Sequence, residues 1–146
     1  MIKVSKSLNA TQKIASDLAK KIISTKSIDG AYVIGLEGEL GAGKTTFVKG
    51  FAKALGVKER ITSPTFVIMK RYELRGVYKL LYHIDAYRLK DEKELIQLGI
   101  EEIFSNPGNI VLIEWADRVK KILPKNRISI HMDHVSKKER KINITE

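Results

Sequence analysis

A Gly-rich segment from Gly38 to Thr45 carries the residue types needed to bind phosphate. Its sequence, Gly-Glu-Leu-Gly-Ala-Gly-Lys-Thr, fits the pattern G-x-x-x-x-G-K-[ST] in full. Glycines let the backbone wrap its N–H groups around phosphate oxygens, and a following helix presents further free N–H groups. In this pattern Lys44 reaches the β- and γ-phosphates and the Thr45 hydroxyl coordinates Mg²⁺. The segment therefore predicts a P-loop nucleotide site; the alternative is a Gly-rich structural turn.

Two carboxylates follow short apolar runs and are candidates for the metal and for the attacking water. Glu114 ends the run at 110–113, and Asp85 ends the run at 80–84. Either side chain could hold Mg²⁺ through its water shell or orient the water. The structural alternative for each is a solvated loop residue or a helix cap. Thr65, in a short polar loop ahead of a strand, is a candidate to approach the γ-phosphate or its Mg²⁺.

Hydrophobic patterns indicate the elements that position these residues. Residues 31–36 are an apolar run typical of a strand buried on both faces, and residues 45–55 follow as a helix closed by Gly56. Strand, Gly loop and helix thus come in the order that a P-loop requires. The other predicted elements are a helix from an N-cap at Asn9, with Gln12 completing a capping box, to about Ile23, a helix over 91–98, and strands at 2–4, 65–69, 77–84, 110–113, 127–132 and 142–144.

The predicted fold class is α/β, with one P-loop NTPase domain over residues 1–146. The central sheet is expected to be mixed, with a parallel core around the Gly loop and added antiparallel hairpins. Gly76 indicates a hairpin between two of the strands, and the last two strands are expected to pair antiparallel. Few helices flank this sheet.

Composition narrows the class of protein. Lys and Arg outnumber Asp and Glu by 27 to 17, which gives a net charge of +10 and favours polyanionic partners. The chain has no cysteine, which excludes disulfides and thiolate chemistry. The N-terminus lacks the apolar core of a signal peptide, and no apolar run approaches the roughly 20 residues that span a bilayer. We therefore expect a cytoplasmic protein.

Other nucleotide-dependent functions are less consistent with the sequence. The chain contains no Asn-Lys-x-Asp segment and no Asp followed three residues later by Gly, so the familiar guanine and switch motifs of GTPases are absent. A small-molecule kinase usually has an acceptor-binding segment and an Arg-rich lid, for which this chain has little room. Two alternatives stay open: a small P-loop kinase, and a basic RNA-binding protein with a nucleotide switch. Strand periodicity puts His131 and His134 on opposite faces, which argues against a shared metal ion.

Several motifs together resemble the TsaE family, formerly called YjeE. They are the P-loop segment 38–47, Ser-Pro-Thr-Phe at 63–66, His-Ile-Asp-Ala-Tyr-Arg-Leu at 83–89, Leu-Gly at 98–99 and Ile-Glu-Trp at 113–115. They come in the order and at the spacings typical of the family, and the resemblance covers roughly residues 8–145. A P-loop alone is shared by a very large class, whereas this combination is specific.

The resemblance implies an ATPase that uses ATP and Mg²⁺ in bacterial tRNA threonylcarbamoyladenosine (t6A) modification. Members act with the TsaB–TsaD pair to support multiple turnover, so tRNA is reached indirectly through that complex. The implied catalytic residues are Lys44, Asp85 and Glu114, and the implied metal ligands are Thr45 and Glu114. The implied nucleotide contacts are Thr11, near the adenine, and Glu39, Leu40, Gly41, Ala42, Gly43, Lys44, Thr45, Thr46, Thr65, Asp85 and Trp115. Where the family often has a Gly before the last strand, this chain has Lys137-Lys138-Glu139-Arg140, so no contact is carried over to that segment.

Overall fold

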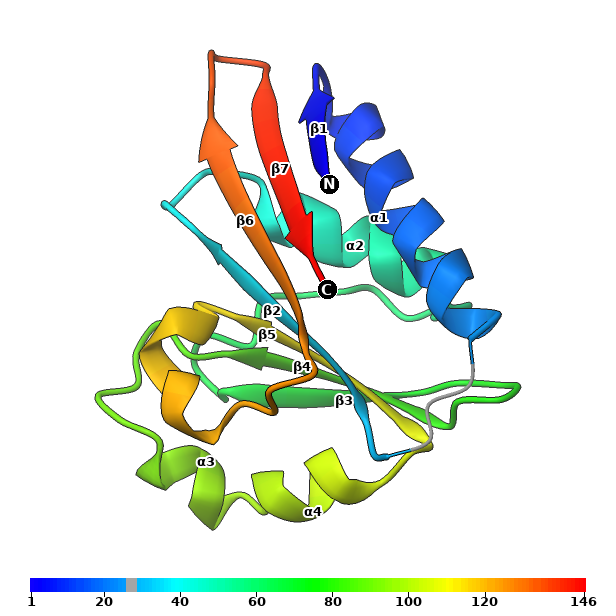
Figure 1. Ribbon diagram of the computed structural model, residues 1–146, viewed down its shortest axis with the longest axis vertical. Helices are drawn as coiled ribbons and strands as arrows, with labels where there is room; N and C mark the ends of the chain where they lie inside the picture. The colour runs from blue at the N-terminus through cyan, green and yellow to red at the C-terminus, as the bar shows by residue number, and fades with distance from the viewer. Residues whose placement is uncertain (26–28) are drawn as a thin grey trace.

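A mixed sheet with helices on both faces forms the fold (Figure 1). The computed structural model describes residues 1–25 and 29–146. The elements of these residues, in chain order, are β1 (Ile2–Ser5), α1 (Leu8–Ile23), β2 (Tyr32–Gly38), α2 (Lys44–Ala54), β3 (Met69–Glu73), β4 (Leu80–Asp85), α3 (Lys93–Gln97), α4 (Ile100–Ser105), β5 (Asn109–Glu114), the 3₁₀ segment η1 (Ala116–Ile122), β6 (Ile128–His134) and β7 (Arg140–Thr145).

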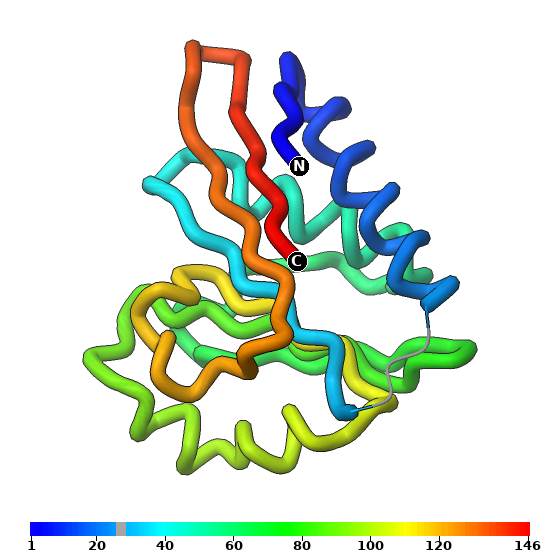
Figure 2. The backbone as a smooth tube through the Cα atoms, in the orientation of Figure 1, coloured from blue at the N-terminus to red at the C-terminus, as the bar shows by residue number. Residues whose placement is uncertain are grey.

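The sheet has a parallel centre and antiparallel edges. Among the described residues it has seven strands in the order β1-β7-β6-β2-β5-β4-β3. β2 pairs parallel with both β5 and β6, and β4 pairs parallel with β5. The β3–β4 and β6–β7 hairpins are antiparallel, and β1 pairs antiparallel with β7, so both ends of the chain lie at one edge (Figure 2). The predicted fold class, with its parallel core and added hairpins, is confirmed.

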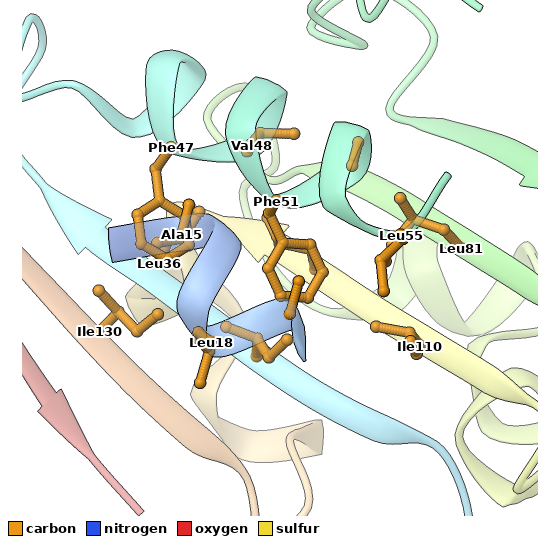
Figure 3. Packing of buried hydrophobic residues seen from close by; sticks show 14 of the residues in the cluster. Ala15, Leu18, Leu36, Phe47, Val48, Phe51, Leu55, Leu81, Ile110 and Ile130 are labelled. Atoms are coloured by element: carbon orange, nitrogen blue, oxygen red, sulfur yellow. The ribbon is translucent and has the colours of Figure 1, made fainter. Parts of the chain in front are cut away.

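Alternating residues of the central strands divide the core between two faces. Leu36 of β2 and Ile110 of β5 face the side covered by α1 and α2, where Phe47 and Phe51 pack over them (Figure 3). Their neighbours, such as Val111, belong to a second cluster under α3, α4 and η1. Burying a large apolar side chain contributes roughly 1.5–3 kcal/mol. Because Phe47 belongs to the first turns of α2, this packing also fixes the end of the Gly-rich loop.

The start of α1 differs from the prediction. Ser7, and not Asn9, is the N-cap: its backbone is extended, and its hydroxyl accepts a hydrogen bond from the Ala10 N–H at 3.0 Å. Asn9 already lies within the helix, so the predicted capping box with Gln12 does not form. Ser7 is as good an N-cap residue as Asn9, and sequence pattern alone does not separate the two. α1 is the longest helix described, and no helix in the described ranges is long and apolar enough to cross a membrane.

The region before β3 also differs from the prediction. Residues 65–68 form a turn in place of a strand, and β3 begins only at Met69. The Val67 and Ile68 N–H groups both donate to the Pro64 carbonyl, at 3.0 and 2.6 Å, which closes the turn. β-Branched and aromatic residues favour strands, but this local hydrogen bonding outweighs that preference. β4 likewise begins at Leu80, later than predicted, and α4 and η1 were not predicted.

One close helix contact gives a stability prediction. A Cβ added at Gly50 of α2 would lie 2.7 Å from the Gln12 Cα of α1 and 2.8 Å from its carbonyl oxygen. In an isolated helix Gly→Ala is stabilising by about 1 kcal/mol. Here we expect Gly50→Ala to lower the free energy of unfolding by about 1–3 kcal/mol, because backbone atoms must move to admit the methyl group.

Urea unfolding followed by circular dichroism measures this change. Gly108→Ala is the control, because its Cβ meets only the movable Asn106 side chain and a Lys79 side chain at van der Waals distance. A more stable Gly50→Ala protein would contradict the close packing of α1 on α2.

Candidate nucleotide-binding site

The loop between β2 and α2 presents backbone donors toward solvent. Gly43 precedes α2 with φ 101°, a left-handed conformation that side-chain-bearing residues rarely adopt. The N–H groups of Lys44, Thr45 and Thr46 belong to the first turn of α2 and have no acceptor within the helix. Free N–H groups and the positive end of the helix dipole attract anions at this position. The predicted strand–Gly loop–helix unit is therefore present, with its donors clustered at one helix end.

Lys44 is buried within this loop. Its side chain is 6% exposed, and its ammonium donates to the carbonyls of Gly38 at 2.5 Å and Glu39 at 2.8 Å. The Nζ also lies 4.1 Å from the centroid of the Trp115 ring. Burial lowers the pKa of Lys44 below its ordinary 10.5, and the nearby Glu114 carboxylate opposes that shift. These neighbours keep the ammonium at the mouth of the loop, where a phosphate can replace the carbonyls as hydrogen-bond acceptor.

The two predicted carboxylates lie side by side. Asp85 ends β4 and Glu114 ends β5, and the two residues are register partners in the parallel pair. They are 5% and 4% exposed. Glu114 accepts a hydrogen bond from the buried His83 Nε2 at 2.6 Å. Because a carboxylate only accepts, Nε2 is the donor in this contact, and His83 Nδ1 has no hydrogen-bond partner among the described residues.

Asp85 is held by groups on two loops. Its Oδ2 accepts from the Thr65 hydroxyl at 2.9 Å, and its Oδ1 accepts from the Tyr87 N–H at 2.9 Å. Each carboxylate oxygen keeps further acceptor capacity. Thr65 thus reaches the carboxylate pair, although the turn that carries it was predicted as a strand. The fixed orientation of Asp85 suits it to position a polar reactant.

A cavity of about 810 Å³ lies over the loop. It is bordered by the start of α1, the P-loop, the end of β5 and the β6–β7 turn. Its lining includes the predicted residues Thr11, Leu40, Gly41, Gly43, Lys44, Thr45, Thr46, Glu114 and Trp115.

The other predicted residues lie outside this lining. Ala42 is fully buried in the core, and Asp85 sits behind Glu114 in the sheet register. Thr65 contacts Asp85 and does not reach the cavity wall. Glu39 lines a smaller neighbouring cavity of about 460 Å³ on the other side of Trp115.

The β6–β7 turn contributes cations that the sequence analysis left out of the site. Lys137, Lys138 and Arg140 line the cavity. The Arg140 guanidinium donates to the Gly41 carbonyl at 3.2 Å and to three carbonyls of its own turn at 3.0–3.3 Å. Arg140 and Gly41 are 99 residues apart in sequence, so no local pattern could have indicated the contact.

The fold and the site together define the class. A P-loop follows the central strand β2, and buried carboxylates end the neighbouring strands β5 and β4. This is the arrangement of a P-loop NTPase domain, in which the C-terminal ends of parallel strands meet the phosphate-binding loop at one edge of the sheet.

Comparison with known proteins gives the family. The model of the family "Threonylcarbamoyl adenosine biosynthesis protein TsaE" matches residues 5–142. The chain is 47% identical to the TsaE of Bacillus subtilis over 113 residues, 77% of this chain and 68% of the relative. It is 34% identical to the TsaE of Treponema pallidum over 94% of this chain and 99% of the relative. The chain belongs to the TsaE family of threonylcarbamoyladenosine biosynthesis proteins.

A solved structure agrees with this assignment. The crystal structure of Bacillus subtilis YdiB superposes with a TM-score of 0.74 at 36% sequence identity, covering 99% of this chain and 83% of the other. The predicted family resemblance is therefore confirmed.

The buried His83–Glu114 contact gives a second prediction. His83→Leu leaves the Glu114 carboxylate without its buried donor, so we expect the free energy of unfolding to fall by about 1–3 kcal/mol. His83→Gln keeps a side-chain N–H donor and should recover part of that loss. Urea unfolding of the two variants measures the difference. Equal stability of both variants would show that the hydrogen bond contributes nothing beyond packing.

Proposed function

We propose that this chain binds and hydrolyses ATP with Mg²⁺, as the ATPase subunit of the t6A modification machinery that acts with TsaB and TsaD. One observation carries the enzymatic part. The buried Lys44 ammonium and the free N–H groups of α2 share a cavity with Glu114, and Asp85 stands beside Glu114 in the sheet. Cationic donors for phosphates and carboxylates for metal and water are the groups that phosphoryl transfer to water requires.

The loop residues suit the triphosphate. The N–H groups from Gly43 to Thr46 bind phosphate oxygens, and Lys44 exchanges its two carbonyl acceptors for the β- and γ-phosphates. The exposed Thr45 hydroxyl and the Glu114 carboxylate both line the cavity and are the oxygen ligands that suit Mg²⁺. When bound, Mg²⁺ neutralises charge that develops on the phosphate oxygens.

Asp85 is the residue we assign to the attacking water. The water oxygen forms a bond to the γ-phosphorus while the bond from that phosphorus to the β–γ bridging oxygen breaks. ADP keeps the electron pair of the broken bond, and the inorganic phosphate takes the oxygen and the protons of the water. Asp85 orients the water and accepts a hydrogen bond from it. The Tyr87 N–H and the Thr65 hydroxyl hold the carboxylate in place for that task.

The far side of the cavity suits the nucleoside. Asn9 and Thr11 of α1 border it there, where the resemblance places the adenine. Lys137 and Lys138 add positive charge at the rim, which favours a polyanionic ligand. Trp115 lines the cavity beside the proposed phosphate site, with its ring centroid 4.1 Å from the Lys44 Nζ.

Family membership supports the role in the machinery. A second cavity of about 650 Å³ lies at the other end of α2, and its charged lining residues, apart from Glu59, are cations: Lys49, Lys53, Lys58 and Arg60. It contains neither the Gly-rich loop nor the carboxylates Asp85 and Glu114. Hydrolysis by this subunit resets the TsaB–TsaD pair between turnovers, and the partners hold the tRNA. A small-molecule kinase would instead pass the γ-phosphate to an organic acceptor.

Replacing Lys44 tests the nucleotide site. We expect Lys44→Ala to lower the rate of ATP hydrolysis by about 100-fold or more, because the charge that stabilises the phosphates is lost. Lys53→Ala, on the exposed side of the same helix, should hydrolyse ATP like the wild type. Phosphate release measures the rate, and circular dichroism checks the fold. Unchanged hydrolysis by a folded Lys44→Ala protein would show that the site is misassigned.

A drop-out reconstitution tests the biological role. TsaB, TsaD, a TsaC-type enzyme, unmodified tRNA, threonine, bicarbonate and ATP are combined with or without this protein, and modified adenosine is measured over several turnovers. We expect multiple turnover only with the protein, restored by the wild type and not by Lys44→Ala. Equal product with and without the protein, using cognate partners, would leave a P-loop ATPase with another purpose.

A further inference from the structure

A turn beside the carboxylates presents two large apolar side chains to solvent. Phe66 is 82% exposed and Val67 is 58% exposed. Single exposed apolar residues are common on protein surfaces and require no explanation by themselves. These two residues, called the 66–67 tip below, are adjacent and sit at the apex of a turn, so their surroundings decide whether the exposure has a role.

The turn is rigidly built. Pro64 is buried, and its carbonyl accepts hydrogen bonds from both the Val67 and the Ile68 N–H groups. Ile68 has φ 70°, a strained left-handed conformation that is rare for a β-branched residue. The Ile68 side chain packs against the core cluster under α3 and α4. The fold thus maintains a strained turn in which Pro64 and Ile68 pack against the protein and the 66–67 tip is exposed to solvent.

Both flanks of the turn are bonded to Asp85. The Thr65 hydroxyl donates to the Asp85 carboxylate, and the Asp85 N–H donates to the Ile68 carbonyl, each at 2.9 Å. The residues between these two anchors are Phe66 and Val67. A displacement of the 66–67 tip therefore changes the hydrogen bonds that position Asp85, the residue that we assign to the attacking water.

A cation accompanies the tip. The Arg88 guanidinium lies 4.6 Å from the centroid of the Phe66 ring, and it forms no ion pair with a carboxylate in the described part of the chain. An aromatic ring with a free cation beside it complements an apolar pocket edged by carboxylates. A second copy of this chain would bring its own Arg88 and a net charge of +10 to the contact, which disfavours self-association.

We propose that the 66–67 tip docks into an apolar, carboxylate-edged pocket on a different protein, and that docking controls ATP hydrolysis through the Thr65–Asp85 hydrogen bond. The regulatory half rests on the proposed ATPase function. Docking that favours one position of Thr65 and Asp85 changes the hydrolysis rate, and nucleotide binding changes affinity for the partner in return.

The test compares two valines of nearly equal exposure. Val67 is 58% exposed in the tip, and Val77 is 57% exposed in the β3–β4 connection, at the other end of β3. The cognate TsaB–TsaD pair is the protein probe. We expect Phe66→Ser and Val67→Ser to weaken binding to the pair by about tenfold or more and to lose most of its effect on hydrolysis. Val77→Ser should match the wild type, and Trp115 fluorescence should report unchanged nucleotide binding in all three variants.

Other outcomes separate the claims. If the wild type binds nucleotide but not the pair, the proposed role in the machinery fails, and this assignment of the tip fails with it. If the wild type binds the pair and both tip variants bind equally well, only the docking proposal is overturned. Concentration-dependent dimers in sedimentation that Val67→Ser abolishes would make a second copy the occupant, and this too overturns it.

A separate variant tests the coupling. Thr65→Val keeps the shape of the side chain and removes the hydroxyl that bonds Asp85. Because the tip is intact, we expect binding to the pair within about twofold of wild type. The ratio of hydrolysis with the pair to hydrolysis without it should fall toward one. A wild-type ratio in this variant would show that the Thr65–Asp85 hydrogen bond does not transmit docking.

Discussion

The placement of one buried ammonium group constrains the rest of this structure. Lys44 lies at the start of α2. Its ammonium donates hydrogen bonds to the Gly38 and Glu39 carbonyls and lies over the Trp115 ring. A buried cation needs such acceptors and nearby negative charge, and Glu114 supplies the charge. Because the carbonyls are neutral acceptors, an anionic phosphate can displace them with a gain in interaction energy. In the function that we propose, phosphate oxygens take the place of these two carbonyls at the ammonium.

The sheet order brings the other groups to this ammonium. β2 lies beside β5, and β4 lies beside β5, so the ends of three parallel strands form one edge. Register pairs Leu36 with Glu114 and Glu114 with Asp85. His83 is buried in β4, two residues before Asp85, and its hydrogen bond fixes the position of the Glu114 carboxylate. The ends of parallel strands therefore bring Asp85 and Glu114 to Lys44, although they follow it by 41 and 70 positions in the sequence.

Much of the site could be predicted because its chemistry is local in sequence. The P-loop pattern lies between a strand and a helix that the sequence also predicts, and Asp85 and Glu114 are the last residues of the largely apolar strands β4 and β5. Non-local contacts were missed: Arg140 meets the P-loop from the opposite end of the chain. The turn at Thr65 was predicted as a strand because its composition favours one, whereas its hydrogen bonds to Pro64 and Asp85 are visible only in three dimensions. The unpredicted parts of the fold are the short elements, whose patterns carry little information.

The central claim is that Lys44 and the α2 N–H groups bind the triphosphate opposite Glu114. A crystal structure with Mg²⁺ and a non-hydrolysable ATP analogue tests it most directly. The account predicts phosphates over residues 41–45, the Lys44 ammonium moved from the Gly38 and Glu39 carbonyls to phosphate oxygens, and the metal between Thr45 and Glu114. A nucleotide bound elsewhere, or phosphates in this loop with Lys44 still on its carbonyls, would contradict it.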